Sequence, residues 1–124
     1  MTNPSIFSVA LSCLTILLSC KNETIAKFEV VNTTKESIDS FYILPDNSKD
    51  NFIQVEPNAK ISYNINMTDV PKVDGSYQLS FKSKTKAVFI PFGYYSNGYP
   101  MESITRIVIR PDTVLIKPEY KDNY

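Results

Sequence analysis

The amino-acid sequence predicts an all-β protein in which two antiparallel sheets pack face to face as a sandwich. Apolar and polar side chains alternate in several short runs, which is the period of a strand with one buried face. Ile, Val, Thr, Tyr and Phe, which favour strands, are frequent, and turn residues recur between the runs. No helical period follows residue 20. A small closed barrel is the alternative arrangement of the same strands.

The first strand is expected over residues 25–32, because apolar Phe28 and Val30 alternate with charged neighbours. A second strand is expected over residues 37–44. Its apolar side chains do not alternate cleanly, which indicates either a bulge near Ser40 or burial on both faces.

Residues 46–51 are the most polar run in the chain and predict a surface loop. Asp46, Ser48 and Asp50 have the spacing of the first ligands in a calcium loop of the EF-hand kind. The sixth position of such a loop needs Gly, but Asn51 occupies it here. A solvated turn is therefore the preferred interpretation, and no metal site is predicted.

The remaining strands are expected where apolar side chains alternate or run together, at residues 52–55, 61–67, 76–82, 87–92, 104–109 and 113–117. The connection over 68–75 is long enough to cross from one sheet to the other. Pro91 cannot donate a backbone hydrogen bond, so it predicts a sheet edge or a bulge. About seven or eight short strands of this kind are typical of an immunoglobulin-like sandwich.

Asn97-Gly98 is a strong signal for a two-residue hairpin turn, because both residue types tolerate positive φ angles. The predicted register pairs Ser96 with Tyr99 and sets Tyr94 opposite Met101. The connection between these two strands is therefore expected to be tight.

Three of the eight tyrosines, Tyr94, Tyr95 and Tyr99, gather around this turn. Two interpretations stay open. The rings either pack beside the hairpin and seal one end of the core, or form an exposed platform that binds a protein or a glycan. Adjacent Tyr94 and Tyr95 must point to opposite faces of a strand, so at most one of them shares a face with the core.

The N-terminal segment has the features of an export signal. Residues 6–18 give about a dozen mostly apolar positions, which is short of the roughly 20 needed to cross a bilayer. The end of the segment, Leu17-Leu18-Ser19-Cys20, resembles the lipobox of bacterial lipoprotein signal peptides. The resemblance implies cleavage between Ser19 and Cys20 and acylation of Cys20. A plain secretory signal is the alternative.

This resemblance divides the chain into a removed signal peptide (1–19), a lipidated cysteine with a short tether (20–24), the sandwich domain (25–117) and a polar C-terminal tail expected to fray (118–124). It implies attachment to a membrane of the cell envelope through a lipid. Lys21 resembles the residue found in lipoproteins sorted to the outer membrane, where the domain would lie on the periplasmic face or the cell surface.

Asp112-Thr113-Val114 resembles the short motif at which Bacteroidota attach O-linked glycans to exported proteins, and the Asn, Lys, Ile and Tyr bias of the chain is compatible with such a source. The resemblance implies that Thr113 carries a glycan.

Composition narrows the function. The chain has 13 basic and 13 acidic residues, so it lacks the excess of basic residues that would indicate binding to nucleic acid. It contains no His, which removes the commonest general base and metal ligand, and no cofactor or catalytic residue is predicted. The expected function is a lipid-anchored module that binds a protein or glycan, as an immunity or accessory protein would. The alternative is a small hydrolase or transferase that uses the carboxylates of Asp69, Asp74 and Glu102.

Overall fold

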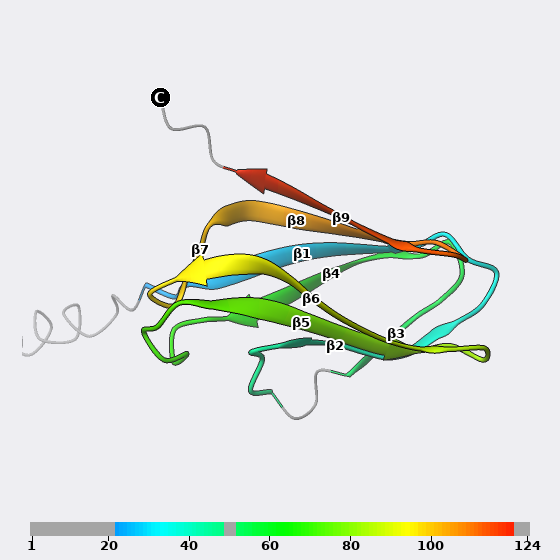
Figure 1. Ribbon diagram of the computed structural model, residues 1–124, viewed down its shortest axis with the longest axis horizontal. Coiled ribbons are helices and arrows are strands. Elements are labelled where there is room, and N and C mark those ends of the chain that lie inside the picture. Colours follow the sequence, from blue (N-terminus) through cyan, green and yellow to red (C-terminus); the bar gives the residue numbers. More distant parts are fainter. Residues whose placement is uncertain (1–21, 49–51, 121–124) are drawn as a thin grey trace, which may run out of the picture.

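A computed structural model describes residues 22–48 and 52–120. The described residues form nine strands and no helix, and the strands make two sheets that stack against each other (Figure 1). The predicted all-β, two-sheet sandwich is therefore confirmed. Ser19 and Cys20, and with them the predicted signal cleavage and lipidation, lie outside the described residues.

The first sheet has four strands in the order β4 (Lys60–Asn66), β1 (Ile25–Asn32), β8 (Glu102–Ile109) and β9 (Val114–Tyr120). The second sheet has five strands in the order β3 (Ile53–Val55), β2 (Ile38–Leu44), β5 (Gly75–Lys82), β6 (Ala87–Ser96) and β7 (Tyr99–Pro100). The loop between β4 and β5 crosses from one sheet to the other, as its length predicted.

The pairing of β1 with β8 departs from the predicted antiparallel arrangement. These two strands run parallel, with Phe28 beside Thr105 and Val30 beside Ile107. Hairpin connections force sequential strands to run antiparallel, but β1 and β8 are far apart in sequence and are free of that constraint. The first sheet is therefore mixed.

The second sheet contains two irregularities that absorb extra residues. Ser40 has a positive φ angle of 52° where β2 shifts register, so the predicted bulge is confirmed. β6 continues beyond the predicted end at Phe92, because Gly93 takes a φ angle of 65° and accommodates a second register shift. Pro91 lies where β6 has no neighbour on its outer side, because β7 pairs only with the last two residues of β6.

Both ends of the domain differ from the predicted boundaries. β9 extends to Tyr120, which pairs with Glu102, so the predicted fraying from residue 118 is wrong for residues 118–120. At the N-terminus, the carbonyl of Thr24 accepts a hydrogen bond of 2.7 Å from the Met67 N–H. The Thr24 N–H donates to the Thr68 hydroxyl at 3.1 Å, so the tether ends at Glu23 rather than at Thr24.

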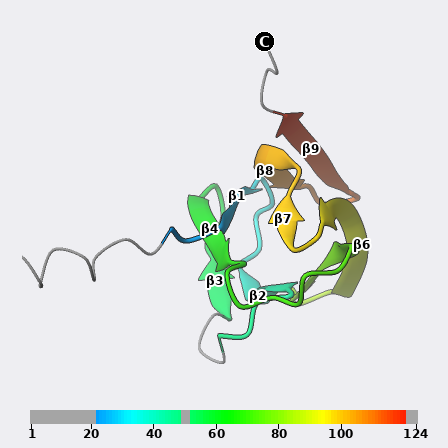
Figure 2. The same ribbon diagram turned by 90° about the vertical axis from the view of Figure 1, so that its left-hand side faces the viewer.

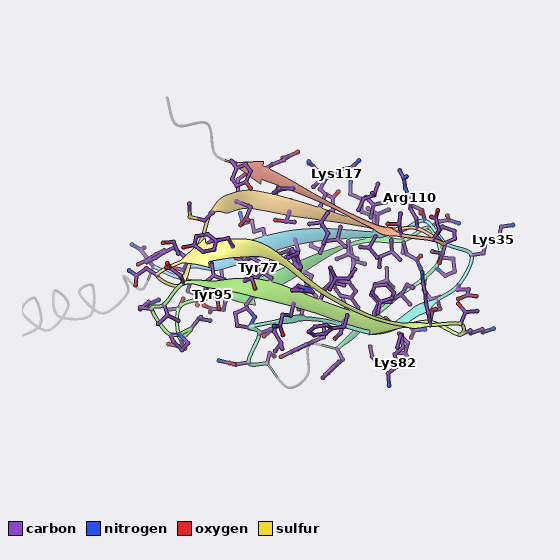
Figure 3. The ribbon with its side chains drawn as sticks, in the orientation of Figure 1. Lys35, Tyr77, Lys82, Tyr95, Arg110 and Lys117 are labelled. Carbon is purple, nitrogen blue, oxygen red and sulfur yellow. The ribbon has the colours of Figure 1, made fainter. Side chains whose placement is uncertain are left out.

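Aromatic rings from both sheets meet in the core. Phe28 of β1 contacts Tyr77 of β5 edge to face, with 5.1 Å between the ring centroids, and Phe92 of β6 lies 5.9 Å from Phe28. Figure 3 shows the side chains that fill the space between the two sheets. The predicted inward-facing rows are buried at Phe28, Val30, Tyr63, Ile65, Tyr77, Leu79, Phe81, Ile107 and Ile109, whereas Ile61 is half-buried.

The buried polar side chains include those of Asn32, the last residue of β1, and Asp46, in the predicted surface loop. Asn32 is fully inaccessible; its amide nitrogen donates to the carbonyls of Glu36 (2.8 Å) and Val55 (3.0 Å), and its oxygen accepts the N–H and hydroxyl of Thr34. Asp46 accepts a 3.0 Å hydrogen bond from the Tyr63 hydroxyl, so the prediction of a solvated turn is wrong at this residue. The Tyr63 hydroxyl therefore replaces water as a hydrogen-bond partner of the Asp46 carboxylate.

The sandwich has two distinct ends along its long axis (Figure 1). The hairpin end, defined by residues 67–74 and 96–99, lies where β1 begins, and Figure 2 looks onto it. The far end, defined by residues 33–37, 83–86 and 110–113, contains the turns at the opposite tips of the strands.

Candidate functional site

The turn between β6 and β7 has the predicted conformation. Asn97 and Gly98 have φ angles of 52° and 75°, and Ser96 pairs with Tyr99. The pairing has the predicted register, but it stops at Tyr95 and Pro100, where β7 ends, so the predicted pair of Tyr94 and Met101 does not form.

The structure separates the three tyrosines of the predicted platform. Tyr94 and Tyr99 are exposed, with 47% and 52% of their surfaces accessible, whereas Tyr95 is 8% accessible and belongs to the core. The Tyr95 ring lies 5.4 Å from the Tyr77 ring and occupies the space that a Cβ atom at Gly75 would need. The inference that Tyr94 and Tyr95 point to opposite faces is confirmed. Of the two interpretations, core packing holds for Tyr95, and its place among the candidate binding residues is wrong.

Asp74 holds the exposed part of the hairpin end together. One carboxylate oxygen accepts the Asn97 N–H at 2.9 Å and the other accepts the Tyr94 hydroxyl at 2.8 Å. These hydrogen bonds to the charged form lower the pKa of Asp74 below its ordinary 3.8, and the hydrogen bond to Asp74 raises the pKa of Tyr94. Asp74 is therefore an ionised acceptor that fixes the turn.

This contact predicts an acid titration at the hairpin turn. Because the folded-state pKa of Asp74 is lowered, its contribution to stability is present above pH 3.8 and is lost as the pH falls through the lower value. We expect the Asn97 amide resonance to titrate with a midpoint below 3.8 in nuclear magnetic resonance spectra. Asp74→Asn should abolish this titration and Asp112→Asn should leave it unchanged. A midpoint at or above 3.8 would contradict the assignment.

The three carboxylates of the alternative enzyme hypothesis, those of Asp69, Asp74 and Glu102, lie in different environments. Asp69 is exposed in the loop between β4 and β5, and Asp74 is committed to the hairpin turn. Glu102 borders a hollow of about 490 Å³ between β6 and the β8–β9 pair, lined also by Phe92, Gly93, Tyr94, Met101, Thr105, Ile116, Pro118 and Tyr120. Within the part of the chain that the structure describes, no cluster of three His, Cys, Asp or Glu side chains could hold a metal ion.

The buried Tyr77 hydroxyl has no hydrogen-bond partner within the described residues. Burial raises the pKa of Tyr77, and the nearby charge of Glu102 raises it further. Tyr77 is therefore protonated at neutral pH and does not act as an anionic base.

A cleft of about 430 Å³ opens at the far end, where turns from both sheets meet. The Lys86 ammonium donates to the Pro111 carbonyl at 3.0 Å, and the Thr85 hydroxyl donates to a Glu36 carboxylate oxygen at 3.3 Å. Figure 3 shows Lys35 at this end, on the connection between β1 and β2. The cleft is lined by Thr33, Thr34, Lys35, Glu36, Ile38, Ser83, Thr85, Lys86, Ile109 and Pro111.

No protein-family model, curated protein or solved structure matches this chain. Its candidate sites are therefore defined by their own geometry. Across residues 22–48 and 52–120, the structure also contains no helix that could cross a membrane.

The far-end cleft was not among the sites predicted from the sequence. Its walls come from three turns that are distant in the chain, and each turn alone has the composition of an ordinary solvated connection. Thr113 lies beside these turns and is exposed, so it is accessible to the modification that its motif predicts.

Proposed function

We propose that this protein is a lipid-anchored binding module of the bacterial cell envelope that recognises a protein or a glycan through its far-end cleft. The observation that carries the proposal is the position of the turns that line the cleft, which lie at the opposite end of the sandwich from the start of β1 (Figure 1). The lipobox resemblance supplies the anchor, and the fold supplies a rigid spacer between the anchor and the cleft.

The length of the tether limits how the domain can sit on a membrane. Thr24 already belongs to the folded domain, so four peptide units separate it from Cys20 and span at most about 14 Å. The strands then lead away from this end for roughly 26 Å, the length of an eight-residue strand such as β1. The hairpin end therefore stays near the lipid, and the far end is the part of the domain most accessible to a partner.

The lining of the cleft suits a polar ligand with one flat or apolar face. Pro111 provides exposed apolar surface, and the buried Ile38 and Ile109 lie beneath the cleft. Hydroxyl and charged groups surround it, including the ammonium of Lys35 and the hydroxyl of Ser83. Sugar rings and short peptide segments combine these properties, and binding sites for them pair an apolar surface with a few polar groups.

The anchor is tested by replacing Cys20 with Ala in cells supplied with a labelled fatty acid. The wild-type protein should carry the label and remain in the membrane fraction after an alkaline wash, because three acyl chains bury many methylenes at about 0.8 kcal/mol each. The Cys20→Ala protein should be unlabelled and released. An unlabelled wild type, or a variant retained equally well, would overturn the anchor.

The same cells test the cleft with a photoreactive phenylalanine derivative placed at Lys35 or, as a control, at Lys117. Both positions are exposed, but Lys117 lies on β9, away from the cleft. We expect a discrete cross-linked product from position 35 that is absent from position 117. Equal patterns from both positions would assign recognition to another surface.

A further inference from the structure

We infer that the hairpin end and the flanking residues Tyr94 and Met101 form a lipid-contact surface, on which Val73, Tyr94, Tyr99 and Met101 lie in the headgroup region of the membrane that holds the anchor. The inference rests on the proposed lipid anchor and goes beyond it. The exposed tyrosines would then contact phospholipid, and the side chains of the hairpin end would determine how the domain is oriented on the membrane.

Exposed apolar side chains are concentrated at this end. The described residues include eight large hydrophobic side chains that are exposed, at Leu44, Phe52, Val73, Phe89, Tyr94, Tyr99, Met101 and Tyr120. Val73, Tyr94, Tyr99 and Met101 belong to the hairpin turn or to residues that contact or flank it, and Tyr120 ends β9 opposite Glu102. Exposed apolar side chains gathered at one tip of a domain favour an interaction surface there.

The surface is rigid enough to act as one unit. Gly98 donates its N–H to the Val73 carbonyl at 3.1 Å, so the loop between β4 and β5 packs against the hairpin turn. Asp74 fastens both Asn97 and Tyr94 to the same loop. The exposed rings therefore project from a fixed base, and little order has to be gained when they meet a membrane.

The side chains match the chemistry of a bilayer interface. Tyrosine combines an apolar ring with a polar hydroxyl and is enriched at the level of lipid headgroups. The Lys72 ammonium lies over the Tyr99 ring, 5.3 Å from its centre, and donates to the Thr68 carbonyl at 3.2 Å, so a positive charge lies beside this exposed ring.

The tether holds this end of the domain near the membrane. Glu23 and Thr24 line the same hollow of about 440 Å³ as Tyr99 and Pro100, so the tether meets the domain beside the exposed Tyr99 ring. With at most about 14 Å of chain between Thr24 and Cys20, a folded partner has little room between the hairpin end and the bilayer. Phospholipid is the occupant that this geometry favours.

The absence of Trp from the chain allows a direct test with a single fluorophore. Tyr99→Trp places it on the hairpin end, and Phe89→Trp is the matched control, since Phe89 is 64% exposed on β6 toward the far end. Each full acylated protein is reconstituted into vesicles of phosphatidylethanolamine and phosphatidylglycerol, with and without bromine on the acyl chains.

A ring at the boundary of headgroups and acyl chains lies roughly 5–10 Å deep, within reach of the bromine atoms. We expect the Tyr99→Trp protein to lose emission in brominated vesicles, because contact at this depth brings the ring near the bromine atoms. The Phe89→Trp protein should lose none. Equal quenching of the two proteins, or none in either, would overturn the inference.

The outcomes separate this inference from the proposed function. If the protein carries no acyl chain and does not float with the vesicles, both the anchor and the lipid contact are wrong. If it floats and Tyr99→Trp is not preferentially quenched, the anchor stands and the lipid-contact surface is rejected. Val73→Trp, at a loop residue that is 59% exposed, repeats the measurement should Tyr99→Trp disturb the fold.

Discussion

Replacement of Tyr95 by Ala is expected to cost about 3–5 kcal/mol of folding free energy, the range found for large aromatic residues deleted from a core. Tyr95 is 8% accessible and packs against Tyr77, and its ring fills the space left by the missing side chain of Gly75. Domains of this size are stable by about 5–15 kcal/mol, so the loss is a large fraction of the total.

Tyr99→Ala is the matched comparison, because Tyr99 lies on the same hairpin but is exposed. Its loss should stay within about 1 kcal/mol, as is usual for surface positions. Urea denaturation of the two variants measures both values. Similar losses for both would mean that the structure assigns the wrong tyrosine to the core.

The Asn32→Ala variant is expected to lose about 3 kcal/mol or more, because four hydrogen bonds disappear and several buried partners lose theirs, at roughly 1–3 kcal/mol for each unsatisfied group. The carbonyls of Glu36 and Val55 and the N–H of Thr34 are left without the Asn32 side chain. The side chain joins β1 to the β2–β3 region, so the two sheets lose a polar connection at the far end.

Asn64→Ala provides the control for this prediction, since Asn64 is exposed on β4. Its free energy of unfolding should change by no more than about 0.5 kcal/mol. The comparison is made by thermal and urea denaturation under identical conditions. Equal stability of Asn32→Ala and the wild type would show that the buried amide is dispensable.

Local patterns were sufficient to predict most of the strands. The alternation around Phe28 and Tyr77 reports which face of each strand is buried, and Asn97-Gly98 reports the conformation of the turn between β6 and β7. Both signals depend only on residues close together in sequence, and the structure agrees with them.

Features that depend on distant residues could not be read in this way. The burial of Tyr95 depends on Gly75, and the burial of Asn32 depends on carbonyls from two other segments. The far-end cleft likewise combines turns from three parts of the chain, and the parallel partner of β1 comes from near the C-terminus. The pattern of residues within one segment does not indicate which distant segment will contact it in the folded protein.

The parallel pairing of β1 with β8 also sets the order in which the domain can assemble. A chain that emerges from its N-terminus presents β1 first, but Phe28 and Val30 have no partners on the β8 side until Thr105 and Ile107 have followed. Folds dominated by such non-local pairs form slowly, in milliseconds to seconds, because distant segments must meet before contacts offset the lost entropy. β1, the strand that begins nearest the proposed lipid anchor, is therefore among the first to be synthesised and among the last to be paired with a neighbouring strand on both edges.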